Sequence, residues 1–144
     1  MSGSQTYDRL VRARRFIDER FDQPLTLDSI AAEACYSRFH FVREFQREFR
    51  TTPHEYLQAR RLERAKQLLA AGHHSVTDVC YEVGFQSPGS FSTLFRRVVG
   101  QPPAAYRART LVVVPGFGQV GPLVFVPACY IRMFGLDRRP ARRL

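Results

Sequence analysis

Cysteine is scarce in this sequence and never occurs at a spacing that binds metal. The three cysteines, Cys35, Cys80 and Cys129, include no CxxC pair, and the four histidines form no HExxH motif. An odd set of cysteines is typical of a reducing compartment, where disulfides are rare. We therefore expect no metal site, no cofactor and no disulfide scaffold. Cys80 should pack on a helix face as a small hydrophobic residue, and Cys35 should lie near a turn.

The N-terminus also lacks the apolar segment of a signal peptide. Residues 1–6 are small and polar, and residues 7–21 are heavily charged, with apolar residues at the spacing of the first helix. We expect residues 1–6 to be disordered and the protein to be cytoplasmic.

Acidic residues and lysine are few compared with arginine. The chain of 144 residues has 22 basic and 13 acidic residues, a formal net charge of +9, and every basic residue except Lys66 is arginine. This excess favours a partner that carries many phosphates or carboxylates. A nucleic acid fits that description, although an anionic membrane surface would satisfy the charge equally well.

An internal repeat flanks one long segment. Residues 53–71 predict a helix, because apolar residues recur at the helical period between a proline suited to the first turn and a glycine suited to the stop. Two sets of residues before and within this helix match residues later in the chain. The residues 49 positions later match Leu27, Ile30, Ala34 and Tyr36, and the residues 50 positions later match Ser37, Phe41, Phe45, Phe49, Pro53 and Tyr56. Because the offset changes between two helical patterns, each copy predicts a helix, a short turn and a second helix.

Suitable capping residues precede the helices of both copies. They are Thr26, Ser37, Ser75 and Ser87, and Asp78 completes a capping box with Ser75. In the helix after Ser37, three phenylalanines spaced four residues apart must face the core. The residues left on its outer face are Arg38, Phe39, Val42, Arg43 and Gln46. This mixture suits readout of a DNA major groove, where apolar groups contact thymine methyls and arginine pairs with guanine.

These patterns resemble the tandem helix-turn-helix domain of AraC/XylS-type bacterial transcription regulators over about residues 7–109. The matching residues are Ser37, His40, Arg43, Phe45, Pro53, Tyr56, Arg61, Leu62, Ala65, Leu68 and Leu69, then Gly84, Phe85, Ser87, Phe91, Phe95, Gly100, Pro103 and Tyr106. The resemblance implies an all-α fold of seven helices in which residues 53–71 join a first unit, about residues 7–52, to a second unit at residues 75–109. It also implies a sequence-specific, non-enzymatic regulator of transcription whose two recognition helices enter adjacent major-groove segments about 34 Å apart.

The resemblance assigns DNA contacts to both units. Base contacts in the first unit fall on Phe39, Val42 and Arg43. The matching positions in the second unit are Pro88, Gly89, Ser90 and Thr93, of which Ser90 and Thr93 remain as base contacts because proline and glycine cannot reach a base edge. Contacts to the DNA backbone are assigned to Arg38, Gln46, Arg47, Ser87, Arg96 and Arg97. We therefore expect base readout mainly from the first unit and backbone positioning from both.

Partners and alternatives follow from the same resemblance. Double-stranded DNA is the expected partner, with no membrane association, and RNA polymerase is a second candidate because activators of this family commonly contact it. Six residues precede the first predicted helix, so the chain resembles short members without a separate effector domain. The alternative is an interaction protein that keeps the fold and binds DNA without sequence preference. In some bacteria a domain of this family is joined to an alkyl-transfer DNA repair activity that uses a reactive cysteine. That activity is disfavoured here, because the cysteines have no neighbouring acid–base residues.

Residues 110–144 lie outside the resemblance. No charge occurs in residues 111–131, but prolines and glycines interrupt this stretch, which excludes a membrane-spanning helix. Residues 111–114 and 123–126 predict the two strands of a short β-hairpin, which should pack on the protein or make a dimer contact, so that the protein is a monomer or a dimer through this extension. An arginine-rich tail follows.

Overall fold

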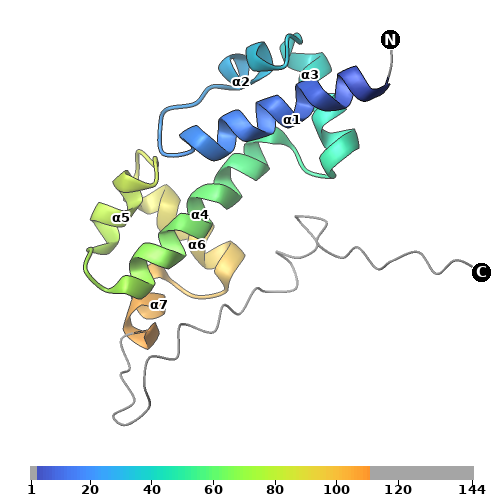
Figure 1. Ribbon diagram of the computed structural model, residues 1–144. Helices are drawn as coiled ribbons and strands as arrows, with labels where there is room; N and C mark the ends of the chain where they lie inside the picture. The colour runs from blue at the N-terminus through green and yellow to red at the C-terminus, as the bar shows by residue number, and fades with distance from the viewer. Residues whose placement is uncertain (1–2, 111–144) are drawn as a thin grey trace, which may run out of the picture.

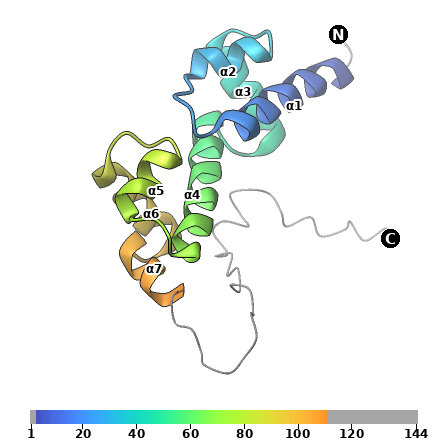
Figure 2. The same cartoon turned by 60° about the vertical axis from the view of Figure 1, so that its left-hand side comes forward.

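The computed structural model describes residues 3–110, which form seven α-helices in two groups along one central helix. The helices are α1 (Gly3–Arg20), α2 (Leu27–Glu33), α3 (Arg38–Phe49), α4 (Pro53–Ala71), α5 (Val76–Glu82), α6 (Pro88–Val99) and α7 (Pro103–Thr110). Figures 1 and 2 show α1 to α3 gathered at the N-terminal half of α4, and α5 to α7 gathered at its C-terminal half. We call these groups unit one and unit two. The predicted all-α fold is confirmed, and the proposed hairpin lies outside the described residues.

The first helix starts earlier than the sequence pattern predicts. Helix α1 begins at Gly3, so residues 3–6 belong to a helix, and the expectation that residues 1–6 are disordered is wrong for these four. The apolar stripe that defines the helix starts only at Tyr7, but no proline between these positions interrupts the backbone. Periodicity thus located the buried part of α1 and missed its polar first turn.

Side-chain caps mark the starts of several helices. Thr26 and Ser29 form a reciprocal capping box on α2, and Ser75 and Asp78 form the predicted one on α5. A third capping box, on α4, joins the hydroxyl oxygen of Thr52 to the backbone amide of Glu55 at 3.2 Å. Ser37 occupies the N-cap position of α3 as predicted, but its side chain accepts no capping hydrogen bond. Capping therefore fixes the starts of α2, α4 and α5 more firmly than that of α3.

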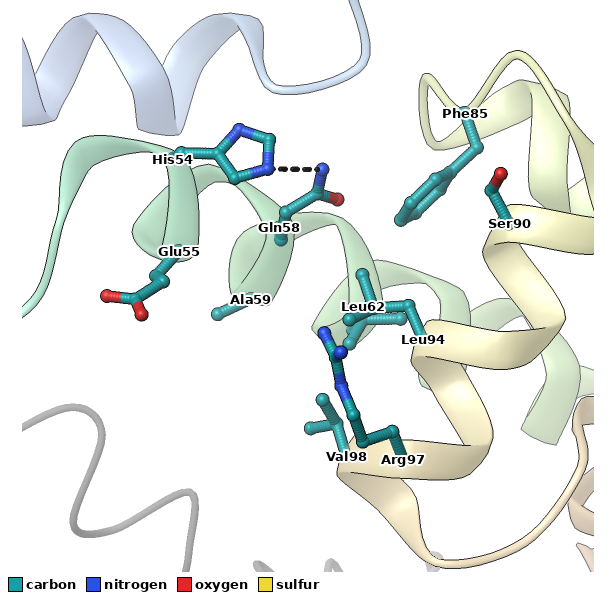
Figure 3. Close-up of a pocket in the computed structure, with 10 residues that line it drawn as sticks. All are labelled: His54, Glu55, Gln58, Ala59, Leu62, Phe85, Ser90, Leu94, Arg97 and Val98. Atoms are coloured by element: carbon teal, nitrogen blue, oxygen red, sulfur yellow. Dashed lines mark hydrogen bonds between the residues drawn. The ribbon is translucent and has the colours of Figure 1, made fainter.

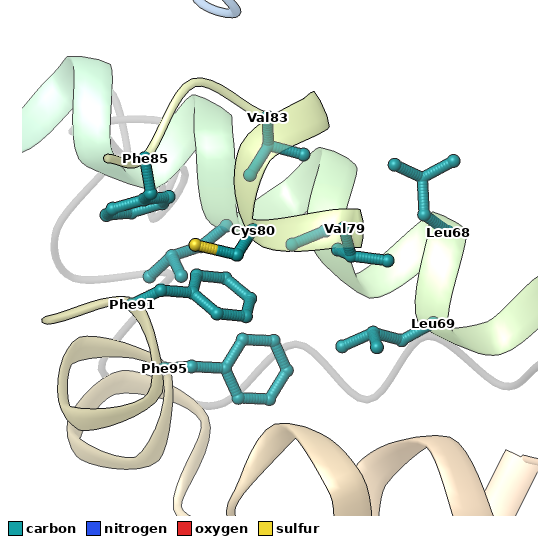
Figure 4. Packing of buried hydrophobic residues seen from close by; sticks show 10 residues of the cluster. Leu68, Leu69, Val79, Cys80, Val83, Phe85, Phe91 and Phe95 are labelled. Carbon is teal, nitrogen blue, oxygen red and sulfur yellow. The ribbon is translucent and has the colours of Figure 1, made fainter. Parts of the chain in front are cut away.

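Each unit has its own hydrophobic core, built on two phenylalanines one helical turn apart. In unit one Phe41 and Phe45 are fully buried, and in unit two Phe91 and Phe95 are fully buried. Figure 4 shows the core of unit two, where Cys80 packs among these rings. Burial raises the pKa of the Cys80 thiol, as expected for a cysteine that serves as a small hydrophobic residue.

Helix α4 contributes side chains to both cores. The internal repeat also extends further towards the N-terminus than Leu27, the first matching residue named in the sequence analysis. Leu10, Ala13 and Ile17 of α1 match Leu62, Ala65 and Leu69 of α4 at an offset of 52, and all six side chains are at most 1% exposed. At the other end of α4, Tyr56 packs on the core ring of Phe45 as Tyr106 of α7 packs on Phe95. Helix α4 thus completes the core of unit one as α7 completes that of unit two, and it supports the core of unit two as α1 supports that of unit one.

Tyr56 also ties α4 to α1. Its hydroxyl donates a hydrogen bond to the carboxylate of Asp18, with oxygen separations of 2.9 and 3.1 Å. Burial of the ring and the neighbouring charge of Asp18 raise the pKa of Tyr56 to about 12, so the phenol remains a donor at neutral pH.

No helix within residues 3–110 is long and apolar enough to cross a membrane.

Candidate nucleic-acid interface

Helix α3 presents a mixed apolar and basic face to solvent. Phe41 and Phe45 hold its inner face in the core, which turns Phe39 outward with 86% of its surface exposed. Arg43 and Gln46 are exposed beside it, and Val42 is half-buried at the edge of the same face. The predicted base-contacting residues of unit one therefore lie together on one exposed face. A large exposed aromatic ring beside a guanidinium group is typical of a surface that meets a partner.

Two arginines near this face are already paired within the protein. Arg38 donates from Nε and Nη2 to the two carboxylate oxygens of Asp28 on α2, at 3.0 and 2.7 Å. Arg47 forms an ion pair with the buried carboxylate of Glu44 one turn earlier. The Arg38 side chain remains half exposed and that of Arg47 mostly exposed, and both keep further N–H donors, so neither pair prevents contact with a phosphate.

Helix α6 presents short side chains on the corresponding face. Ser90 and Thr93 are exposed, and Gly89 between them and the N-cap offers no side chain. The hydroxyl oxygen of Ser87 accepts a hydrogen bond from the backbone amide of Ser90 at 3.4 Å, so Ser87 caps the helix from a position close to its exposed face. Arg96 and Arg97 are exposed in the last turn of α6. The structure thus groups all the predicted contact residues of unit two on or beside one helix.

The basic groups on the two recognition helices differ in their pairing. The side chains of Arg43, Arg96 and Arg97 make no ion pair or hydrogen bond with any other residue that the structure describes, unlike those of Arg38 and Arg47. With a net charge of +9 on the chain, these unpaired guanidinium groups give α3 and α6 the electrostatic character of a surface that binds phosphate groups.

A cleft of about 450 Å³ separates α6 from the N-terminal half of α4. Figure 3 shows Arg97 and Leu94 on the α6 side, and Leu62 and Ala59 on the α4 side. Gln58 forms a 3.4 Å contact with the imidazole Nε2 of His54 at the end of this cleft towards unit one. The cleft adjoins the exposed face of α6, because Ser90 and Arg97 belong to both.

Metal binding finds no support in residues 3–110. No cluster of histidine, cysteine, aspartate or glutamate side chains suitable for a metal ion is present among them. Cys35 is exposed at the turn between α2 and α3, in the left-handed conformation with φ of 56°, and Cys80 is buried.

The two helices α3 and α6, each the second helix of a helix-turn-helix unit, define a DNA-binding class of protein.

Comparison with known proteins identifies the family. A helix-turn-helix domain family matches residues 30–109, more than half of the chain. The regulatory protein SoxS of Salmonella typhimurium is 34% identical over 109 residues, which is 76% of this chain and 99% of SoxS. The transcriptional regulator AlkR of Acinetobacter baylyi is 36% identical over 89 residues, which is 62% of this chain and 29% of AlkR.

Solved structures show the same architecture. The DNA-binding domain of the global transcriptional factor AdpA, in complex with a target DNA, is 33% identical with a TM-score of 0.67, covering 69% of this chain and 90% of that one. An AraC-type regulator from Chromobacterium violaceum is 29% identical with a TM-score of 0.67, covering 79% and 100%. The chain therefore belongs to the AraC/XylS-type helix-turn-helix family of DNA-binding transcription regulators. This confirms the predicted family, and the prediction that the chain is not an enzyme.

The structural role of one residue was not predicted from the sequence. Arg61 of α4 is among the residues that match the family, but no contact was assigned to it, and it is 8% exposed and contacts both units. The signal was the α1-to-α4 part of the repeat, in which Arg9 and Arg61 occupy equivalent positions.

Proposed function

We propose that this regulator binds double-stranded DNA by placing α3 and α6 in adjacent major-groove segments on one face of the duplex. The observation that carries the proposal is the face of α3, where Phe39 is 86% exposed beside an unpaired Arg43. Burying that ring against a base edge removes apolar surface from water, and the guanidinium can pair with guanine in bidentate fashion. The AdpA complex, in which a related domain is bound to its target DNA, supports this mode.

The two units divide the work in this proposal. Phe39, Val42 and Arg43 read bases from α3, while Ser90 and Thr93 make weaker base contacts from α6. Contacts to the DNA backbone come from Arg38, Gln46, Arg47, Ser87, Arg96 and Arg97. The guanidinium groups of Arg96 and Arg97 support this role, because they have no ion-pair or hydrogen-bond partner among the described residues. Arg38 and Arg47 would instead share their N–H donors between a carboxylate and a phosphate.

One copy suffices for this mode of binding, because a single chain carries both recognition helices. We propose a monomeric DNA complex that acts in the cytoplasm, where its DNA target lies, and that contacts RNA polymerase at promoters. Sedimentation of the protein with a fluorescent operator measures the stoichiometry. Transcription from purified components, with the operator at its natural distance from a promoter, tests the contact with polymerase.

Selection of binding sites from random DNA, at a stated salt concentration, tests the central proposal. We expect a site with two segments, of which the one under α3 is strongly specified. The native protein is compared with Arg43→Ala and with Thr93→Ala, its equivalent in unit two. Recovery of no preferred sequence, together with affinity that falls steeply with salt, would instead support an interaction protein that binds DNA only through its charge.

A further inference from the structure

A buried arginine on α4 lies where the two units meet. The Nε of Arg61 donates a hydrogen bond to the carbonyl oxygen of Phe21 at 2.7 Å, and its Nη2 donates to the carbonyl oxygen of Gln23 at 2.9 Å. These carbonyls directly follow α1, at the negative end of its helix dipole. The backbone of unit one therefore satisfies a cation that is only 8% exposed.

The same side chain contacts unit two. The guanidinium carbon of Arg61 lies 5.7 Å from the centre of the Phe85 ring, within the range of a cation–π interaction. Burial lowers the pKa of Arg61, and the nearby charge of Asp22 acts in the opposite direction. Arginine nevertheless stays charged in proteins, so all its donors persist at neutral pH. One side chain of the shared helix thus holds the end of α1 and the turn of unit two together.

A glycine brings unit two against the same segment. Gly84, in the turn between α5 and α6, has φ of +92°, and a Cβ at this position would lie 2.9 Å from the carbonyl oxygens of both Phe21 and Asp22. These are backbone atoms that cannot rotate away. Residues 21–23 therefore make two separate contacts: they accept hydrogen bonds from Arg61, and their backbone lies close to that of Gly84.

The equivalent residues of unit one make no such junction. Arg9 matches Arg61 and lies 5.6 Å from the ring of Tyr36, the counterpart of Phe85, but its side chain donates no hydrogen bond to any described residue. Cys35 matches Gly84 and is exposed. The ring contact therefore recurs in both halves of the repeat, whereas the hydrogen bonds that join Arg61 of α4 to the carbonyls after α1 have no counterpart at Arg9.

We propose that Arg61 and Gly84 are positioning residues that fix unit two relative to unit one and so set the spacing of the two DNA segments that the protein accepts. The inference rests on the proposed function and adds a source of specificity to it. Because α6 offers short side chains to bases, unit two contributes to sequence selection mainly through where it is held. A rigid junction makes the distance between the two bound segments part of the recognised signal.

The first test measures the junction without DNA. Spin labels at Arg12 and Ala104, both exposed, report the distance between the units once Cys35 and Cys129 are replaced by serine. Native protein should give one narrow distance distribution and Arg61→Met a broad one. Arg9→Met is the matched control, because it removes the equivalent ring contact within unit one, and its distribution should stay narrow. An equally narrow distribution for Arg61→Met would overturn the proposal. If that variant does not fold, Arg61→Lys, which keeps the charge but not both hydrogen bonds, decides by the same outcomes.

Gly84→Ala tests the second contact with its own control. Its Cβ must push the end of α1 away, which should shift the mean label distance. Gly100→Ala introduces the same left-handed strain, with φ of +87°, but its Cβ meets nothing within 4 Å, so the distance should not change. Equal shifts in both variants, or no shift in either, would contradict a specific contact at Gly84.

The final test uses the operator selected from random DNA and versions with one base pair added or removed between its two segments. Native protein and Arg9→Met should bind the altered versions about tenfold more weakly, and Arg61→Met should reduce this discrimination to about twofold while keeping its base preference under α3. Full discrimination by Arg61→Met would overturn the proposed role in spacing. If native protein selects no operator at all, the proposed function fails, and the label distances still decide whether the junction exists.

Discussion

The recognition helices of units one and two occupy equivalent positions in the fold, but their exposed faces carry chemically different side chains. At an offset of 50, the position of exposed Phe39 is taken by Gly89, and that of Arg43 by Thr93. The inner faces meanwhile remain alike, with two fully buried phenylalanines in each helix. A shared core with divergent outer residues indicates that the fold constrains one face of each helix and leaves the other free for a different task.

The charged residues of the two helices follow the same division. Arg47 and Arg97 are equivalent, but Arg47 is paired with buried Glu44 whereas the counterpart of Glu44 is Leu94. Helix α3 thus holds Arg38 and Arg47 in ion pairs within the protein, and it exposes the aromatic ring of Phe39. Helix α6 leaves the side chains of Arg96 and Arg97 without an ion pair or hydrogen bond among the described residues, and it offers only short side chains to a base edge. The difference favours base reading by unit one and phosphate binding by unit two.

The largest expected effect tests what the units share. Phe45→Ala and Phe95→Ala each remove a fully buried ring, and each should lower the free energy of unfolding by about 3–5 kcal/mol. Urea denaturation measures the change. Phe39→Ala is the control, because its ring is exposed, and it should change stability by less than about 0.5 kcal/mol. A much smaller cost for one of the two core variants would show that the cores are not equivalent.

The next effect tests the base-reading role of unit one. Arg43→Ala should weaken binding to the selected operator by about 1–3 kcal/mol and relax preference at one base pair, because a bidentate contact to guanine is lost. Thr93→Ala, at the equivalent position, should leave the preferred sequence nearly unchanged. Titration against specific and random DNA at the same salt concentration measures both. If Arg43→Ala weakens the two kinds of DNA equally, Arg43 contacts phosphate and the proposed division is wrong.

A smaller effect, on the salt dependence of DNA binding, distinguishes the unpaired arginines of α6 from Arg47, which is paired with Glu44. Arg96→Ala and Arg97→Ala should weaken binding to all sequences alike, and each should reduce the slope of log affinity against log salt by about 0.9. Arg47→Ala should reduce the slope by less, because Glu44 already neutralises part of its charge in the free protein. Binding measured over a series of salt concentrations gives the slopes. An Arg47→Ala change as large as that of Arg97→Ala would show that the pair with Glu44 opens at no cost.

The sequence predicted the features that depend on local patterns. Residues 53–71 were expected to form one helix because a proline, an apolar stripe and a glycine define it, and α4 spans these residues. The exposed face of α3 followed from the phenylalanines that fix its buried side. Buried positions are set by periodicity, which is visible in a single sequence.

Contacts between distant segments could not be read in the same way. Arg61 matches the family pattern, but its partners are far away in the sequence, and only folding brings it within hydrogen-bond distance of the carbonyls after α1. Gly84 likewise matches the family pattern, but the sequence does not show that the backbone of residues 21 and 22 approaches it closely. The ion pairs of Arg38 and Arg47 depend on rotamers, which the sequence does not specify.

The smallest expected effect lies in the capping boxes, where the two units differ by one ionisable group. The box on α5 uses Asp78, and the equivalent box on α2 uses Ser29. Hydrogen bonds from the Ser75 hydroxyl and the Ser75 backbone amide hold the pKa of Asp78 below its usual range. A depressed carboxylate pKa stabilises the fold above the pKa of the unfolded chain, and this stabilisation is lost as pH falls through the lower folded value. Acid should therefore weaken α5 more than α2.

Reciprocal substitutions isolate this effect. Asp78→Ser gives α5 the uncharged box of α2, so the difference in melting temperature between it and native protein should shrink as pH falls below about 4. Ser29→Asp gives α2 an ionisable box and should add a new loss of stability in the same pH range. Glu55, whose pKa is also lowered, is present in every variant and cancels from the differences. Differences that stay constant between neutral pH and the acid range would show that the charge of residue 78 adds nothing to its cap, and that the two boxes are equivalent despite their chemistry.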